Sequence, residues 1–454
     1  MVQFGMWKNS PFLFLASLLI SSLSIILPVT AWAEETTDKA HTLLTIQGSN
    51  TLGAKLAPAL VKGYLQEMGA RRIEMVDHVE NESQIFAQLN DELIKVSIAA
   101  HGSSTGFKAL EASQADIAAA SRPAKKQEIE NLSPLTQLTS AASEHIIGID
   151  GLAIIIHPQN PMQQLSVQQV AAIFSGAIKN WSELGGRVAE INLYARDDQS
   201  GTWDSFKRMV LGNSTLAAKA QRFEANDELS DRVSSDVNGI GFVGLPSVRR
   251  AKLVAIADGF AKALEPTRLS IATEDYALSR RLYFYTDDEP NNPHVQSFIK
   301  FTLSSKGQQI VAANGFISQH INIVEPVGFE DLPLDFQQLT EQGQRLTVNF
   351  RFKEGSAKLD NRALRDIERL VQFSQTQAGK KLLLIGFGDQ KRSQKRSQLL
   401  SKLRAMAVRR ELVKQGIYPK FSYGYGEQLP VASNLTEAGR FKNRRVEVWL
   451  SDVD

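Results

Sequence analysis

The feature that most constrains the fold is a unit that occurs four times in the first half of the chain. Each unit is a short apolar strand, a polar loop rich in Gly, Ser and Thr, and the start of a helix. The loops lie at residues 47–51, 101–106, 121–123 and 196–202. In an open α/β sheet such loops meet at the carboxyl ends of the strands, where ligands bind. The repetition therefore predicts an α/β fold with a ligand site at one edge of its sheet.

The loop at 196–202 has the chemistry of an anion-binding site. The first backbone N–H groups of the helix after it have no partner inside that helix and lie at the positive end of its dipole. Ser200 and Thr202 add hydroxyl donors, and Gly201 lets the backbone approach a ligand closely. Arg196 adds a forked positive charge. An ordinary N-cap is the alternative for one loop alone. Four such loops in one domain favour a site for a small tetrahedral oxyanion.

Composition excludes several other classes of protein. With 454 residues, 43% of them hydrophobic and 22% charged, the chain is expected to form more than one folded domain. A formal net charge of +2 gives no reason to expect a nucleic-acid partner. The sequence has no cysteine, which excludes disulfide bonds, thiolate metal sites and a cysteine nucleophile.

No motif in the sequence predicts catalysis. None of the seven histidines has a metal-binding spacing, and no Walker-type phosphate loop is present. Ser200 is not flanked by a Gly-x-Ser-x-Gly elbow, and the pair formed by Ser200 and Asp198 lacks a histidine placed to act as base. We therefore expect a binding protein and not an enzyme, with no metal ion and no cofactor.

The first 33 residues are typical of a cleaved signal peptide. Lys8 supplies a positive charge, residues 11–28 are almost wholly apolar or small, and Ala-Trp-Ala at 31–33 is a small-x-small cleavage site. An uncleaved membrane anchor is the competing interpretation, because the apolar run is borderline in length for a membrane span. The pattern predicts that the mature protein lies outside the cytoplasm.

The rest of the chain divides into two predicted domains. The apolar segment 146–157 is long enough to be a strand that crosses between two lobes, one at about 42–150 and 261–323, the other at about 151–260. Residues 324–344 mix Pro, Gly and polar residues and are interpreted as a linker. Residues 345–454 then predict a small α+β sandwich in the order β-α-β-α-β-β.

Several segments of the first domain resemble the PstS family of periplasmic phosphate-binding proteins. They are Ile-Phe-Ser-Gly at 173–176, Asn-Trp at 180–181, Gly-Gly at 185–186, the loop at 196–202, and the segments 151–160 and 238–243. The resemblance covers about residues 42–323 and implies a two-lobed (type II) binding-protein fold that closes around its ligand by hinge motion. It implies that phosphate or a related oxyanion is held by Thr51, the Leu52 backbone, Ser103, Arg196, Ser200, Gly201 and Thr202. It also implies that Asp198 orients the Arg196 guanidinium.

One position departs from that family. Ser121 stands where many members have an Asp that accepts the proton of hydrogen phosphate, so the case against other oxyanions is weaker here. Ser121 is retained as a candidate ligand residue. Arg122 is either a second ligand contact or a solvated surface charge, and the sequence leaves both open.

The second domain resembles the OmpA-like peptidoglycan-binding family through blocks that keep their order. They are Gly-Phe-Gly-Asp at 386–389, Leu-Ser-Lys-Leu-Arg-Ala at 400–405, Gly-Tyr-Gly-Glu at 424–427 and Asn-Arg-Arg-Val-Glu at 443–447. The resemblance implies that Asp389 and Arg404 grip the ammonium and carboxylate of diaminopimelate in the stem peptide, with Ser397 and Leu400 beside them. The alternative is that Asp389 caps a helix and Arg404 is a solvated charge. Arg444 and Arg445 are expected to be structural.

Together these features predict a protein of a Gram-negative cell envelope that binds inorganic phosphate or a similar oxyanion in the periplasm while attached non-covalently to peptidoglycan. The expected partners are the oxyanion, peptidoglycan and, if the protein feeds transport, an ABC permease. A fixed scavenger or sensor is the other role left open. The competing hypothesis is a ligand-free structural or adhesion protein that uses the binding-protein fold as a spacer.

Overall fold

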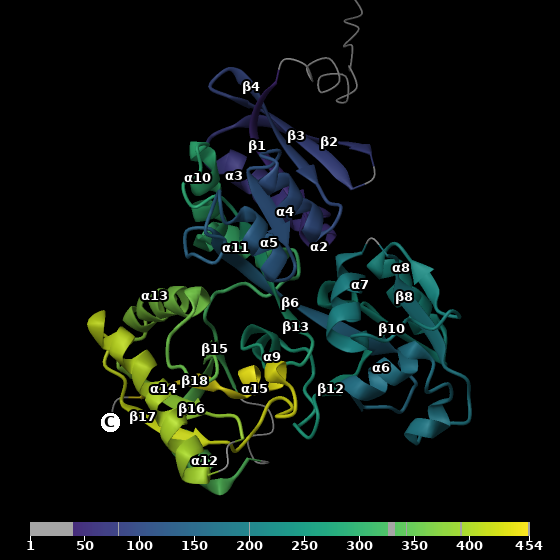
Figure 1. The fold of residues 1–454 in the computed structure, drawn as a ribbon, viewed down its shortest axis with the longest axis vertical. Coiled ribbons are helices and arrows are strands. Elements are labelled where there is room, and N and C mark those ends of the chain that lie inside the picture. The colour runs from purple at the N-terminus through teal and green to yellow at the C-terminus, as the bar shows by residue number, and fades with distance from the viewer. Residues whose placement is uncertain are drawn as a thin grey trace, which may run out of the picture. The chain divides into compact units, whose positions relative to one another are not determined.

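The computed structural model describes residues 40–79, 81–198, 200–325, 332–341, 343–390 and 393–452 (Figure 1). The predicted signal peptide lies outside these residues. Within them, no helix combines the length and the apolar character that a membrane span needs.

The first lobe is a mixed sheet with helices on its faces. Its strands are β1 (His41–Gly48), β2 (Arg71–Val79), β3 (Glu82–Leu89), β4 (Glu92–Ala99) and β5 (Ile117–Ala120). Its helices are α2 (Asn50–Gly53), α3 (Leu56–Glu67), α4 (Ser103–Glu111), α5 (Lys126–Leu132), α10 (Pro293–Leu303) and α11 (Ser305–Ala313). β1 pairs in parallel with β4 and β5, so the loops after these three strands emerge at one edge. The sequence pattern missed β3, which pairs with both β2 and β4.

A single long strand joins the two lobes. β6 (Glu144–Ile156) pairs antiparallel with β13 (Ser279–Tyr285) along its first part and with β10 (Gly239–Gly244) along its second. Ile147 accordingly packs in the first lobe's core, whereas Ile154 packs in the second lobe's core. The predicted crossing strand is confirmed, and it makes one continuous sheet of the two lobes (Figure 1).

The second lobe surrounds an aromatic core. Its strands are β7 (Gln164–Ser166), β8 (Asn192–Arg196), β9 (Gln221–Phe223), β10, β11 (Lys252–Leu253) and β12 (Ala255–Ala257). Its helical segments are α6 (Val167–Ser175), η1 (Trp181–Leu184), α7 (Gly201–Phe206), the π-helical turn η2 (Lys207–Leu211), α8 (Asn226–Ser235), η3 (Leu245–Ser247) and α9 (Arg268–Ala272). The rings of Phe206 and Phe242 stack 3.9 Å apart, which fixes α7 against the sheet. This lobe continues past its predicted end near residue 260, because Ile271, Tyr276 and Leu278 lie in its core.

The second domain is a five-stranded sheet covered by two long helices. Its elements are β15 (Gly343–Arg351), α13 (Asn361–Gln375), β16 (Lys380–Phe387), α14 (Gln394–Lys414), β17 (Phe421–Gly426), α15 (Glu437–Asn443) and β18 (Arg445–Asp452). The predicted order of strands and long helices is present, with α15 added before the last strand. The sheet order is β14-β15-β18-β16-β17.

The segment interpreted as a linker contributes structure to this second domain. β14 (Ile323–Val324) pairs with β15 at the sheet edge. α12 (Leu334–Thr340) places Phe336 against Tyr425, with the ring centres 5.1 Å apart. The described residues of 324–344 are therefore part of a folded unit, and the Pro and Gly content of the segment concealed its two short elements.

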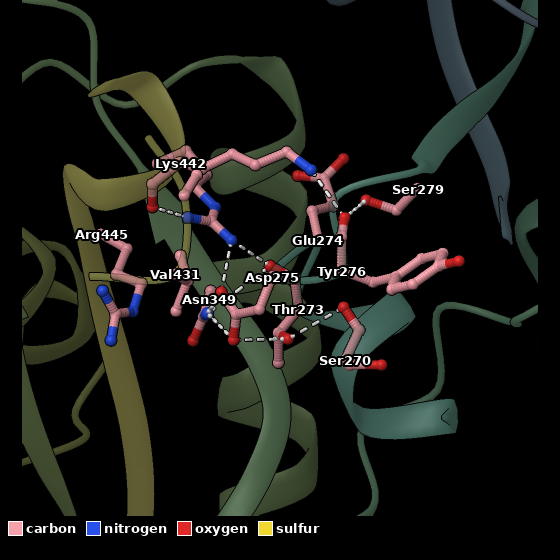
Figure 2. A network of polar contacts seen from close by, with 12 residues as sticks. Ser270, Thr273, Glu274, Asp275, Tyr276, Ser279, Asn349, Val431, Lys442 and Arg445 are labelled. Carbon is pink, nitrogen blue, oxygen red and sulfur yellow. Dashed lines mark hydrogen bonds and ion pairs between the residues drawn. The ribbon is translucent and has the colours of Figure 1, made fainter. Parts of the chain in front are cut away.

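The second domain is docked on the second lobe through buried ion pairs. Asp275 Oδ1 lies 2.6 Å from Arg351 Nη2 and accepts a hydrogen bond from Asn349 Nδ2 at 3.1 Å (Figure 2). Glu274 bonds Arg281 of β13 and also Arg362 of α13, whose Nη1 is 2.7 Å from Glu274 Oε2. Burial alone would raise the pKa of Glu274, but Arg281 and Arg362 hold it well below its usual range.

Further polar contacts tie the second domain to both lobes. Lys442 Nζ donates to the carbonyl oxygens of Tyr276 and Ala277 in the second lobe, at 2.6 and 2.9 Å (Figure 2 shows Lys442 reaching toward Tyr276). Arg365 Nη2 donates to the carbonyl oxygens of Ala141 and Glu144 in the first lobe, at 2.7 and 3.0 Å. The second domain thus contacts the binding domain on both sides of the crossing strand.

Candidate functional site

A cavity of about 300 Å³ lies where the loops after β1 and β8 come together. Five of the predicted ligand residues line it, Thr51 from the first lobe and Arg196, Ser200, Gly201 and Thr202 from the second. Polar residues from both lobes complete its wall, among them Asn50, Lys55, Asn81, Asp197, Asn226 and Asn314. Strand direction explains the convergence. β1 runs in the same direction as the crossing strand β6, toward the second lobe, whereas β8 runs in the opposite direction, toward the first lobe, so the loops after the two strands face each other.

The two loops touch at Gly201. A Cβ built on Gly201 would collide with Thr51 Oγ1 and would lie 3.4 Å from Ser49 Oγ. Only a glycine lets the second-lobe loop approach the first-lobe loop this closely. Ser49 Oγ is itself buried and has no hydrogen-bond partner among the described residues. The junction therefore holds a buried hydroxyl group whose hydrogen-bonding capacity a ligand could satisfy.

Ser200 is the N-cap of α7 and keeps one donor. Its Oγ accepts from the backbone N–H of Thr202 at 3.2 Å and of Trp203 at 3.3 Å. Because a serine hydroxyl has two acceptor lone pairs and one O–H, these two bonds leave the O–H available. The N-cap and the ligand-binding interpretations of this loop are therefore compatible.

Arg196 is held by backbone carbonyls and not by the carboxylate that the sequence suggested. Its Nε donates to Phe223 O at 3.1 Å and its Nη2 donates to Glu224 O. Burial lowers the pKa of Arg196, the nearby Asp197 and Glu224 carboxylates oppose that shift, and Arg280 adds to it. Among the described residues no partner is recorded for Nη1, the nitrogen left to meet a ligand.

The supporting role predicted for Asp198 is wrong. Its Oδ1 pairs with Arg222 Nη2 at 2.5 Å, and its side chain is 85% exposed. Arg222 in turn lies over the Trp203 ring, 4.3 Å from the ring centre. Asp198 therefore fastens the outside of the loop, whereas the Phe223 and Glu224 carbonyls orient the Arg196 guanidinium.

Ser103, Ser121 and Leu52 lie in neighbouring loops but do not line the cavity. Ser121 N donates to Ser103 Oγ at 3.1 Å, so the two predicted residues bond one another. The Leu52 N–H, predicted to hold the ligand, donates to Ser49 O at 3.1 Å, and the Leu52 side chain is buried in the first lobe's core. These loops stay close to the cavity because Ser49 N donates to Ala119 O at 2.9 Å.

Arg122 fits neither interpretation that the sequence left open. Both its terminal nitrogens pair with the Glu128 carboxylate at 2.7 Å, and Nη2 also donates to Ser104 Oγ at 2.9 Å. Its side chain is largely buried, so it is not a solvated charge. A bidentate pair of this kind stabilises the start of α5 and commits the guanidinium to Glu128.

Two charged residues at the cavity were missed by the sequence analysis. Arg280 of β13 and Asp150 of β6 form a buried ion pair, with Nη2 2.6 Å from Oδ2. Arg280 also donates to Gly201 O at 2.6 Å and to Thr51 Oγ1 at 3.2 Å. Asp150 interrupts the strongly apolar strand β6, and a charged residue inside an apolar run was a signal available in the sequence, whereas Arg280 stands in the Ser-Arg-Arg start of β13 and gave no such signal.

In the second domain, Asp389 and Arg404 are both buried at the end of β16 and on α14. Asp389 Oδ2 accepts from Arg444 Nη1 at 3.1 Å, so Arg444 is structural, as predicted, and has Asp389 as its partner. Arg404 Nε donates to Ser356 O at 3.4 Å, and its Nη1 is buried without a hydrogen-bond partner in the described part of the chain. Burial lowers the pKa of Arg404 to about 10, an effect that Asp389 opposes and Arg444 reinforces.

The other two predicted residues of this region have different positions. Ser397 is buried, and its Oγ donates to the Asp389 carbonyl at 3.4 Å. It therefore supports the backbone that carries Asp389. Leu400 lies one turn further along α14 and is half-buried. Arg404 is thus not a solvated charge, and among the described residues it makes no hydrogen bond to a carboxylate.

Comparison with known proteins identifies both parts of the chain. A model of the PBP superfamily domain matches residues 83–306, and a model of the OmpA family matches residues 351–444. The phosphate-binding protein PstS of Staphylococcus aureus is 30% identical over 239 residues, covering 51% of this chain and 71% of that protein. PstS of Pseudomonas aeruginosa is 29% identical over 305 residues, covering 61% and 92%.

Two solved structures are similar to parts of the chain. An ABC-type phosphate transport receptor from Vibrio cholerae matches with a TM-score of 0.48 and 25% identity, covering 60% of this chain and 99% of that one. The peptidoglycan-associated lipoprotein from Burkholderia pseudomallei matches with a TM-score of 0.22 and 23% identity, covering 23% and 89%. The predicted two-lobed α/β fold with a small C-terminal domain is confirmed. On its sequence relatives, the chain belongs to the PstS family of phosphate-binding proteins and carries a C-terminal domain of the OmpA family.

Proposed function

We propose that the first domain binds inorganic phosphate, or a closely similar tetrahedral oxyanion, in the cavity between Thr51 and the loop that carries Arg196. The observation that carries this proposal is that loops of both lobes line that cavity, with a buried guanidinium among them. The relatives reported above are named phosphate-binding proteins, which supports the choice of phosphate over other oxyanions.

The donors at the cavity suit a small anion. The Ser200 O–H and the Arg196 Nη1 hydrogens can both be directed at one point, and Thr202 adds a second hydroxyl. Hydrogen bonds between charged and neutral groups in a buried site are stronger than neutral ones. A ligand that bonds residues of both lobes also holds the lobes together, which is how hinged binding domains retain their ligands.

We propose that the second domain holds the protein to peptidoglycan by gripping a group with an ammonium and a carboxylate, as in diaminopimelate of the stem peptide. The support is that a buried carboxylate, Asp389, acts electrostatically on a buried guanidinium, Arg404, whose Nη1 lacks a hydrogen-bond partner among the described residues. A carboxylate and a forked guanidinium side by side are complementary to such an amphoteric group.

The cellular role follows from these two activities. A periplasmic location is proposed from the pattern of the first 33 residues together with a domain of the OmpA family. A phosphate binder fixed to the cell wall would act in uptake beside an ABC permease, or in scavenging and sensing. The protein is proposed to bind and not to catalyse.

Calorimetry with phosphate and with sulfate tests the ligand. The full chain is expected to bind phosphate, and Arg196→Ala is expected to weaken binding by about a hundredfold, because it removes charge-assisted hydrogen bonds. Arg250→Ala is the matched control, since this arginine of the same lobe is 77% exposed. Heat with neither anion would overturn the proposal and favour the ligand-free spacer.

Co-sedimentation with purified sacculi tests the anchor. Arg404→Ala is expected to leave the protein in the supernatant. Arg410→Ala, on the exposed side of the same helix α14, is the control and is expected to sediment like the unmodified chain. Full sedimentation of the Arg404→Ala protein would show that Asp389 and Arg404 are not the peptidoglycan site.

A further inference from the structure

One buried arginine touches both walls of the cavity. Arg280 lies on β13, the partner of the crossing strand β6, and its side chain is 2% exposed. Its guanidinium donates to Thr51 Oγ1 in the first-lobe loop at 3.2 Å. It also donates to Gly201 O in the second-lobe loop at 2.6 Å and to Ser205 Oγ one helical turn further on. One rigid planar group therefore spans the junction of the two loops.

Asp150 holds that guanidinium in place. Its Oδ2 accepts from Arg280 Nε at 2.9 Å and from Nη2 at 2.6 Å. Asp150 lies on β6 opposite Arg280 in the strand pairing, so the pair sits on the crossing strand and the strand beside it. A buried ion pair of this kind is a costly way to fill a core, because both ions lose their water. Its position at the junction of the Thr51 and Gly201 loops points to a role besides filling the core.

We propose that Arg280, held by Asp150, is a positioning residue for the anion site: it sets the separation of the Thr51 loop and the Gly201 loop, and so the affinity of the cavity for its ligand. The proposal rests on the proposed function of that cavity. Arg280 acts through the two loops. Its Nη1 fixes the first carbonyl of α7, and its Nη2 fixes the Thr51 hydroxyl, so the ligand donors on either side keep one geometry.

If the ion pair of Arg280 and Asp150 were purely structural, the expected results would differ. Such a pair would contribute to the free energy of unfolding, and a folded variant without it would bind phosphate as before. A positioning residue changes the dissociation rate in a folded protein, because the two loops then separate more easily around the ligand. Affinity and dissociation rate, measured on protein that is shown to be folded, separate the two cases.

The test uses the full chain with Arg280→Met, Arg280→Lys and Asp150→Asn. Arg281→Met is the matched control, because Arg281 lies next to Arg280 on β13 but pairs with Glu274 and Asp360 and not with Thr51 or Gly201. Phosphate affinity is measured by calorimetry and the dissociation rate by stopped flow, with circular dichroism and thermal unfolding as checks on folding.

Arg280→Met is expected to bind phosphate about ten- to a hundredfold more weakly, mainly through faster dissociation. Arg280→Lys keeps the charge but cannot fork, so it is expected to recover only part of the affinity. Arg281→Met is expected to stay within about twofold of the unmodified chain. If Arg280→Met does not fold, Asp150→Asn and Arg280→Lys decide the question in the same assays.

Unchanged affinity in folded variants at position 280 or 150 would overturn the inference and leave a structural pair. A loss of affinity in Arg281→Met as large as in Arg280→Met would also overturn it, since the effect would then come from general destabilisation of the strand. If the unmodified chain itself bound no phosphate, the proposed function would fail first, and this inference would fall with it.

Discussion

Replacing Glu274 by Gln tests whether the docking of the second domain contributes to the stability of the whole chain. Glu274 is largely buried and accepts from Arg281 Nε at 2.6 Å and Nη2 at 3.0 Å, while Arg362 Nη1 lies 2.7 Å from it. The substitution keeps the shape of the side chain and removes its charge. Two mostly buried guanidinium groups then lose a shared carboxylate.

The expected loss can be bracketed from these contacts. Removing one partner of a buried ion pair costs about 3–5 kcal/mol. Arg281 keeps Asp360 at 3.2 Å and Arg362 keeps Asp366 at 3.2 Å, so neither guanidinium is left without a carboxylate. We therefore expect Glu274→Gln to lower the free energy of unfolding by about 2–3 kcal/mol, toward the low end of that range.

Urea denaturation followed by circular dichroism measures this loss. The pH dependence has a definite sign, because the pKa of Glu274 is depressed in the folded protein. Its contribution is fully present above the ordinary glutamate pKa and is lost as the pH falls through the lower, folded pKa. The difference between the unmodified chain and Glu274→Gln should therefore be constant from pH 7 to pH 5 and shrink in stronger acid.

Two controls make this experiment decisive. Glu265→Gln changes an exposed glutamate of the same lobe and is expected to alter stability by less than about 0.5 kcal/mol. A double-mutant cycle with Arg362→Met should give a coupling energy above about 1 kcal/mol. A Glu274→Gln protein as stable as the control, or a cycle with no coupling, would refute the claim that these pairs hold the domains together.

Three further outcomes are expected. Gly201→Ala should weaken phosphate binding at least about tenfold in calorimetry because its Cβ would collide with Thr51, whereas Gly244→Ala, with its nearest neighbour at 3.7 Å, should not. Burial lowers the pKa of Lys442 to about 8. The free energy of unfolding of the unmodified chain should therefore rise as the pH increases from 8 toward the ordinary lysine pKa, and Lys442→Met should lack that rise in urea titrations. Phe336→Ala should cost about 3–4 kcal/mol of unfolding free energy, and a cost near zero would show that α12 does not belong to the second domain's core.

The parts of the site that could be predicted from the sequence are those fixed by local chain geometry. A strand that ends in a Gly/Ser/Thr loop before a helix places that loop at the carboxyl end of its lobe's strands, and the ends of β1 and β8 face each other with Thr51, Ser200 and Gly201 at one cavity. The crossing strand β6 was predictable for a similar reason, since residues 146–156 are apolar or Gly except for Asp150 and must be covered on both faces.

Side-chain partners far apart in the sequence could not be predicted. Asp198 pairs with Arg222, 24 residues away, and nothing in the loop itself distinguishes that partner from Arg196. Asp150 and Arg280 are separated by 130 residues, and only the pairing of β6 with β13 brings them together. Short elements such as α12 were missed because a helix of seven residues gives too little periodicity to recognise.

The two sets of contacts made by the second domain have a mechanical consequence. Arg365 is bonded to carbonyls of one lobe, and Lys442 to carbonyls of the other, so the second domain bridges the two lobes that β6 joins. Rotation of one lobe relative to the other would therefore have to break one of these two sets of hydrogen bonds. If the binding domain closes around its ligand as proposed, each closure and opening breaks and remakes bonds to the second domain, and a pull on the proposed peptidoglycan anchor loads the same few hydrogen bonds.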